Sequence, residues 1–129
     1  MITFDLDETQ NYIIIKMFGN ISIDHASRNL NDFTNLCRKL SDNFTIINDI
    51  SGLSIDSEAE LVTLNKVNRK IFELFKVGKV IRVVGKSKPI LMQLVKIDKE
   101  FNLKDIYYVP TIKEAIALAE KEKQSYEDK

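Results

Sequence analysis

The sequence has little cysteine, no surplus of charge of either sign and no long apolar run. Its single cysteine excludes an internal disulfide. The 19 basic and 19 acidic residues cancel, and because DNA-binding proteins usually carry a basic surplus, this balance disfavours nucleic acid as a partner. No apolar run approaches the roughly 18 residues that cross a bilayer, and the start, MITFDLDETQ, lacks the basic and apolar regions of a signal peptide. We therefore expect a cytoplasmic protein without a transmembrane segment.

The length and composition are those of one soluble domain. The chain has 129 residues, of which 44% are hydrophobic and 29% charged, and both fractions are near the average for globular domains. It contains no internal repeat, low-complexity tract or linker. We predict a single domain over residues 1–124 and a frayed C-terminal tail over residues 125–129.

The first half of the chain predicts a β-hairpin, a helix and a strand. Alternating residues at Ile2–Leu6 and the Ile-rich run Tyr12–Phe18 indicate the hairpin. Apolar residues at helical spacing follow, at Ala26, Leu30, Phe33, Leu36, Cys37 and Leu40. Ser22 or Asp24 is expected to be the N-cap of this helix. The short apolar run Phe44–Ile47 is typical of a strand buried in a parallel sheet.

The second half alternates helices and strands. The longest helix is indicated by apolar positions at Leu61, Leu64, Val67, Ile71, Leu74 and Phe75. Gly78 is predicted to end it in the left-handed conformation, before a strand at Val80–Val84. Pro89 favours the first turn of a further helix, whose apolar face is supplied by Ile90, Leu91, Leu94, Val95, Ile97 and Phe101. A strand at Ile106–Val109 and the capping box TIKE, beginning at Thr111, introduce an Ala-rich last helix.

This order of elements predicts the fold class. Strands that alternate with amphipathic helices imply a mainly parallel sheet with right-handed crossovers. We expect an α/β domain with about five strands, an N-terminal β-hairpin and four helices.

A cluster of polar residues, Asp56-Ser57-Glu58, stands between a strand-like run and the longest helical pattern. Ser57 and Glu60 have the spacing of a capping box, Asp56 is an alternative N-cap, and Glu58 favours the first helical turn. Helix-start chemistry alone accounts for every polar residue in the cluster.

The element order and this junction resemble the STAS domain, the family of bacterial anti-sigma-factor antagonists, over roughly residues 12–121. In that family a buried strand leads to a phrase of the form Asp-Ser-Ser-Gly-Leu at the start of the next helix, and a partner kinase phosphorylates the second serine. Here Asp56 and Ser57 match the aspartate and first serine, and Glu58 stands at the phosphoserine position. Ala59 and Glu60 replace the glycine and leucine.

The resemblance implies a STAS-like fold and a non-catalytic regulatory domain, without cofactor, that binds a protein partner such as a kinase or an anti-sigma-type regulator. The partner surface would include Asp49, Asp56, Ser57 and Glu58. A helix N-terminus holds an anion well, and phosphate there adds nearly two negative charges. Because Glu58 places one fixed carboxylate in that field, the implied domain lacks the usual phosphoserine switch and stays in one binding state, with Ser57 as a displaced phosphorylation site. A homodimer remains open.

A second polar stretch, Gly85-Lys86-Ser87-Lys88, follows a predicted strand and precedes a predicted helix. A phosphate-binding P-loop would need another glycine five residues before Gly85, where the chain has Val80, so a Walker-type site is rejected. Two interpretations remain: an anion site formed by Lys86, Ser87 and Lys88 near a helix N-terminus, or a solvated turn.

The other chemically active residues are isolated. His25 and Cys37 are roughly 18 Å apart along a helix, too far to form a catalytic pair, so we expect a surface histidine and a core cysteine. No zinc-ligand spacing and no calcium loop occur. Asp49, at the C-terminal end of a central strand, either faces a ligand or accepts hydrogen bonds from a turn at Ile50–Leu53.

A small-molecule or lipid carrier of the same fold is the alternative function. Its pocket would be lined by Phe72, Phe75, Ile90, Leu94 and Phe101, which are otherwise core residues.

Overall fold

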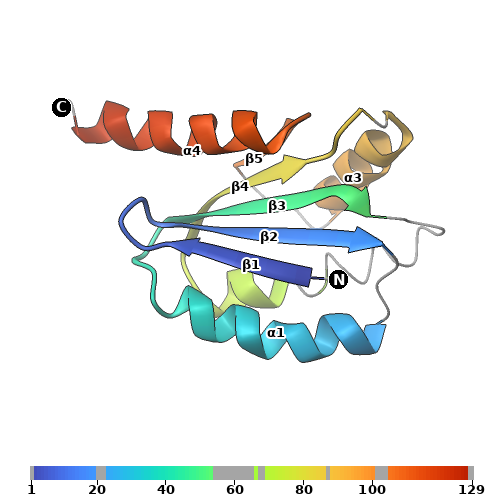
Figure 1. The fold of residues 1–129 in the computed structure, drawn as a ribbon, viewed down its shortest axis with the longest axis horizontal. Helices are drawn as coiled ribbons and strands as arrows, with labels where there is room; N and C mark the ends of the chain where they lie inside the picture. The colour runs from blue at the N-terminus through green and yellow to red at the C-terminus, as the bar shows by residue number, and fades with distance from the viewer. Residues whose placement is uncertain are drawn as a thin grey trace.

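The computed structural model describes residues 2–19, 23–53, 66, 69–86, 88–100 and 105–127. In chain order the elements are β1 (Ile2–Asp7), β2 (Tyr12–Gly19), α1 (Ile23–Cys37), β3 (Phe44–Leu53), β4 (Val77–Val83), α3 (Lys88–Glu100), β5 (Ile106–Val109) and α4 (Ile112–Glu127). Residues 69–74, between β3 and β4, are also helical. Figure 1 shows these elements around one sheet.

The five strands lie in their chain order, β1-β2-β3-β4-β5. β1 and β2 are antiparallel, and the three other pairs are parallel. Because each parallel strand lies beside the strand before it, right-handed crossovers place all the connecting helices on one face. α4 follows the last strand and covers the opposite face (Figure 1). The predicted α/β class, the hairpin and the mainly parallel sheet are confirmed.

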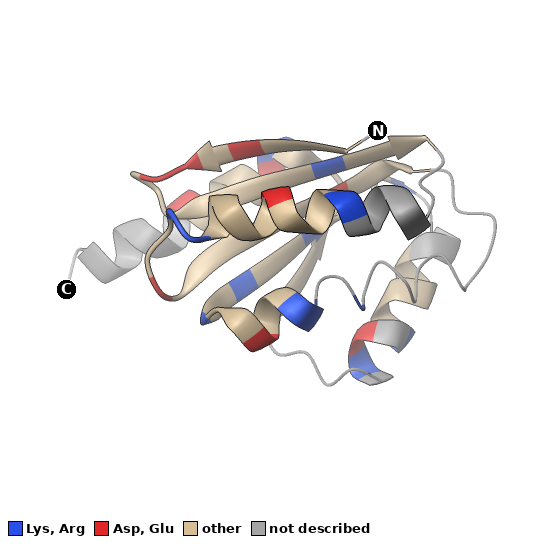
Figure 2. Cartoon of the chain, turned by 90° about the horizontal axis from the view of Figure 1, so that it is seen from below, with Lys and Arg blue, Asp and Glu red and all other residues tan. Residues whose placement is uncertain are grey.

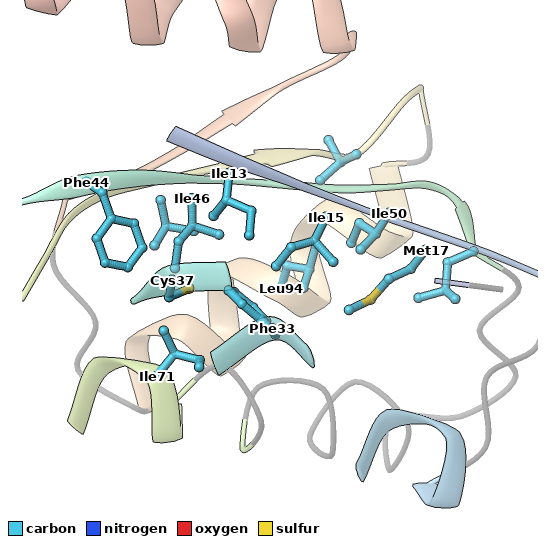
Figure 3. Close-up of a cluster of buried hydrophobic side chains, with 13 residues drawn as sticks. Ile13, Ile15, Met17, Phe33, Cys37, Phe44, Ile46, Ile50, Ile71 and Leu94 are labelled. Carbon is cyan, nitrogen blue, oxygen red and sulfur yellow. The ribbon is translucent and has the colours of Figure 1, made fainter. Parts of the chain in front are cut away.

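The larger core lies between the sheet and the connecting helices (Figure 3). The helices contribute Phe33 and Cys37 from α1, Ile71 from the helical segment 69–74, and Leu94 from α3. The strands contribute Ile13, Ile15, Met17, Phe44, Ile46, Ile50, Leu53 and Val80, and Val84 directly follows β4. The predicted core position of Cys37 is confirmed, since this side chain has no exposed surface.

A smaller core lies beneath α4. Ala115 is fully buried there, together with Tyr12, Ile14, Ile47, Ile81 and Val83 of the sheet. Because helices cover both of its faces, the inner strand β2 is buried at four successive residues, Tyr12 to Ile15. This explains why its sequence is a continuous apolar run and why that of the edge strand β1 alternates.

The prediction for Gly78 was wrong. This glycine lies inside β4, which begins at Val77 rather than Val80, and it is not among the glycines with positive φ. A Cβ at this position would lie 2.5 Å from the carbonyl oxygen of Asn43. Asn43 has a φ of 65°, and its N–H donates to the carbonyl of Lys76 (2.7 Å). The glycine is therefore required by a close approach between two chain segments and not by a helix end.

The helix predictions have mixed outcomes. α1 begins at Ile23, so Asp24 lies inside the helix and is not its N-cap, whereas Ser22 lies outside the described residues. Pro89 falls in the first turn of α3, as predicted. The Thr111 hydroxyl accepts a hydrogen bond from the N–H of Glu114 (3.2 Å), which confirms the cap of α4. Of the longest predicted helix, Leu61, Leu64 and Val67 lie outside the described residues.

The described side chains of the alternative ligand pocket belong to the core. Leu94 is 2% exposed, and Phe72 and Phe75 pack against the same cluster. Phe75 also makes an edge contact with Phe44, with ring centroids 6.1 Å apart. The side chain of Ile90, and Phe101 entirely, are outside the described part of the chain.

Candidate functional site at the carboxyl edge of the sheet

Asp49 lies near the edge where the parallel strands end. Its register partners are Lys16 on β2 and Val83 on β4, and Val83 in turn pairs with Val109 on β5. Asp49 is half-buried, and the strand continues beyond it for four residues, to Leu53. In open α/β sheets this is the edge at which ligands and partners meet the fold.

One carboxylate oxygen of Asp49 holds Ser51 at two points. Oδ1 accepts a hydrogen bond from the Ser51 N–H (3.1 Å) and another from the Ser51 hydroxyl (2.7 Å). Sequence analysis left two interpretations of Asp49, a residue that faces a ligand and an acceptor for a turn at Ile50–Leu53, and these hydrogen bonds fit the second. The residues are extended strand rather than a turn, however, because β3 includes Ile50–Leu53. Ser51 is exposed, so its hydroxyl is fixed in orientation at the surface.

The turn after β4 packs against Ser51. A Cβ on Gly85 would lie 3.3 Å from the Ser51 Cβ, and Gly85 has a φ of +67°. A side chain here would be strained by the backbone and crowded by its neighbour. Lys86 follows in the same turn and is exposed. The ends of β3 and β4 therefore form one continuous surface.

The predicted anion-binding residues are only partly described. Lys86 lies in the turn, Ser87 is outside the described residues, and Lys88 begins α3. The backbone thus places Lys86 two residues before the start of a 13-residue helix and Lys88 at its first position. The anion site remains a prediction.

The predicted switch residues Asp56, Ser57 and Glu58 also lie outside the described residues. β3 ends three residues before Asp56. The assignment of these residues to a partner surface therefore remains a prediction from sequence.

A buried polar network next to Asp49 was missed by sequence reasoning. Arg82 on β4 is 1% exposed, and its guanidinium donates from Nε and Nη2 to the two oxygens of Asp98 on α3 (2.9 and 2.8 Å). Its Nη1 donates to Oδ1 of Asn48 (2.9 Å), and the Tyr108 hydroxyl donates to Asp98 Oδ2 (2.5 Å). A fork of this kind is among the strongest neutralising contacts for a buried carboxylate. It ties α3 to three strands.

The signal for this network was present in the sequence. Arg82 interrupts an apolar strand, and Asp98 stands four residues after Leu94 on the apolar stripe of its helix. Opposite charges at two positions that periodicity assigns to the core indicate an ion pair. The network also raises the pKa of Tyr108, first through burial and then through the hydrogen bond to Asp98.

The described residues offer no metal centre and no activated thiol. Burial raises the pKa of Cys37 to about 12, so this thiol is not a nucleophile at neutral pH. No group of three His, Cys, Asp or Glu residues in the described ranges could hold a metal ion. His25 lies in α1, but its side chain is not among those described. Among the described helices, none combines the length and the apolar character needed to span a bilayer.

Comparison with known proteins identifies the fold. Neither a protein-family model nor a curated protein matches the chain. A structure of the anti-sigma factor antagonist SpoIIAA in its unphosphorylated form is 14% identical, with a TM-score of 0.57, and the match covers 90% of this chain and 94% of that one. The phosphorylated form of SpoIIAA, described as a Bacillus cell fate determinant, gives 14% identity and a TM-score of 0.56, with 90% and 96% covered. The chain therefore has a SpoIIAA-like fold, as the STAS resemblance implied.

Proposed function

We propose that the chain is a non-catalytic regulatory domain that binds a protein partner through the carboxyl edge of its sheet. The surface consists of the end of β3, from Asp49 onward, and the following segment with Asp56, Ser57 and Glu58. The observation that carries the proposal is the exposed Ser51, oriented by Asp49, at the strand end that leads into this segment. The fold of an anti-sigma factor antagonist, matched over 90% of the chain, supports it.

The partner we propose is a kinase or an anti-sigma-type regulator, in the cytoplasm of a bacterium. This proposal transfers the described activity of SpoIIAA, antagonism of an anti-sigma factor, to a chain with the same fold. Glu58 then provides a permanent negative charge at the position that carries the phosphate in the STAS family. The domain would bind its partner without a phosphate at that position.

Partner capture followed by charge reversal tests the proposal. The wild-type chain is used to capture partners from its native cell, and the recovered protein is then purified and its affinity is measured by calorimetry. We expect Glu58→Lys to weaken this binding at least tenfold, because it reverses the charge at the proposed switch position. The matched control is Glu73→Lys, an equal change at an exposed position in the helical segment 69–74. Equal affinities for wild type and both variants would contradict the proposed surface.

The absence of a phosphoserine switch has its own test. Intact-mass spectrometry of the protein isolated from growing cells should show no phosphorylated species, and incubation with a captured kinase should leave the mass unchanged. A phosphate mapped to Ser57 would instead identify it as a displaced phosphorylation site.

A further inference from the structure

The first strand lies at an edge of the sheet that the described strands form. In the order of the described strands β1 comes first, and it pairs only with β2. An edge strand leaves alternate backbone N–H and C=O groups available for another strand. β1 offers six extended residues, ITFDLD, without the proline or glycine that would interrupt pairing.

A groove runs beside this edge, between β1 and α1. It has a volume of about 520 Å³, and its apolar surface comes from Ile2, Phe4 and Leu36, all half-buried. The Phe4 ring packs on Phe33, with centroids 5.8 Å apart, so it is held in place from below. Asp32 and Lys39 of α1 add one charge of each sign to the wall. The groove can accept apolar side chains from a strand added to β1.

The other face of β1 is acidic. Asp5 and Asp7 alternate with the apolar residues and stand in register with Ile14 and Tyr12 of β2. The pKa of Tyr12 is raised, first by burial and then by the negative charges of Asp7, Glu120 and Asp5. The N–H of Gln10 donates to Asp7 Oδ1 (2.8 Å). Figure 2 shows the red acidic segments along the β1 ribbon.

The charge pattern argues against a second copy of the chain as the occupant. An antiparallel β1–β1 pair centred on Phe4 would place each Asp5 opposite a Thr3 and diagonally next to the other Asp5. Four carboxylates, from two copies of Asp5 and Asp7, would then share one face. The two Asp5 carboxylates would be diagonal neighbours, and the Coulombic repulsion between them disfavours this pairing. A strand that carries positive charge on this face is favoured instead.

We propose that β1 is the docking edge for an extended segment of a partner protein in which basic and apolar residues alternate. The basic side chains lie opposite Asp5 and Asp7, and the apolar side chains enter the groove over Ile2, Phe4 and Leu36. The segment adds a sixth strand to the sheet, with backbone hydrogen bonds to β1 and side chains that alternate between the two faces. This edge lies on β1, whereas Asp49 lies on β3, and the proposal does not depend on the function proposed above.

Two synthetic heptapeptides test this docking edge on the full chain. The first is Lys-Val-Lys-Ile-Lys-Val-Lys, and the second has the same composition without alternation, Lys-Lys-Val-Ile-Val-Lys-Lys. Binding is followed by two-dimensional NMR of the labelled protein and by amide hydrogen exchange. We expect the alternating peptide to shift and protect the β1 amides and to bind at least tenfold more tightly than the second peptide.

Matched charge reversals identify the acidic face. Asp5→Lys replaces one favourable cross-strand charge pair by repulsion, so it should weaken the binding of the alternating peptide about tenfold. Glu73→Lys, the same change away from the edge, should leave it unchanged. Asp5 is exposed, and circular dichroism checks that the variant is folded. No binding, equal binding of both peptides, shifts confined to other elements, or a concentration-dependent β1–β1 dimer would each overturn the proposal.

Discussion

At the scale of single residues, the least expected feature is the charge at the centre of the fold. Arg82 and Asp98 are buried at 1% and 3% exposure. Each would be costly to bury alone, and together they are neutralised by two parallel hydrogen bonds. Asn48 Nδ2 is buried beside them and makes no hydrogen bond within the part of the chain that the structure describes. The ion pair therefore serves more to fix the position of α3 on the sheet than to stabilise the fold.

This interpretation predicts strongly non-additive mutations. Arg82→Met should lower the free energy of unfolding by about 3–5 kcal/mol, because it leaves the Asp98 carboxylate buried without its partner. Asp98→Leu should have a cost of similar size, because the buried guanidinium is then left alone. The double variant should lose less than the sum of the two losses, since neither charge then remains. Urea denaturation of the four proteins measures the cycle, and additive losses would show that the two residues do not act as a pair.

At the scale of elements, periodicity predicted the type of each described strand and helix, but not all of their limits. β4 begins three residues earlier than expected because Gly78 approaches Asn43, a contact between segments that no local pattern records. β3 continues past Asp49 because its last residues pair with Phe18 and Gly19 of β2. Arg82 and Asp98 were missed because each stretch was read as apolar as a whole. Of the candidate site residues, Asp49, Lys86 and Lys88 lie in the described ranges, and the hydrogen bonds from Ser51 give Asp49 a defined side-chain environment.

The N-terminal cap of α4 gives a prediction at this scale. Thr111→Ala removes the hydroxyl that accepts from the Glu114 N–H, and this should lower the free energy of unfolding by about 1 kcal/mol. Thr111→Ser keeps the hydroxyl and should lower the free energy of unfolding much less. The loss should appear in urea denaturation and as faster amide exchange in the first turn of α4. Equal stability of the alanine and serine variants would mean that the hydroxyl does not cap the helix.

At the scale of the whole molecule, the two faces of the sheet are covered unequally. Among the described helices, α1, α3 and the segment 69–74 pack on one face of the sheet, and α4 packs on the other. Each face nevertheless packs a tyrosine: Tyr12 is buried beneath α4, and the half-buried Tyr108 packs against the larger core. Lys79 also lies buried at the N-terminal side of the sheet, with Nζ 4.9 Å from the centroid of the Tyr107 ring. Because these groups titrate at alkaline pH, the stability of the packing on both faces depends on pH in that range.

The predicted consequence is a loss of stability above about pH 10. The pKa values of Tyr12 and Tyr108 are raised from 10.0 in the folded chain, chiefly by burial. Above that pH the unfolded chain therefore releases protons that the folded chain keeps, and the free energy of unfolding falls as pH rises. Lys79 acts in the opposite direction, because burial lowers its pKa from 10.5, so its contribution rises with pH until the unfolded lysine is also neutral.

Variants separate the opposing contributions. Urea denaturation between about pH 8 and pH 11 spans the ordinary tyrosine and lysine values. Tyr12→Phe combined with Tyr108→Phe should flatten the decline above about pH 10, whereas Lys79→Met should remove the rise below it and leave the decline. If the double tyrosine variant declined as steeply as wild type, the alkaline loss would have to come from groups other than Tyr12 and Tyr108, and the proposed link between their packing and the pH dependence would be wrong.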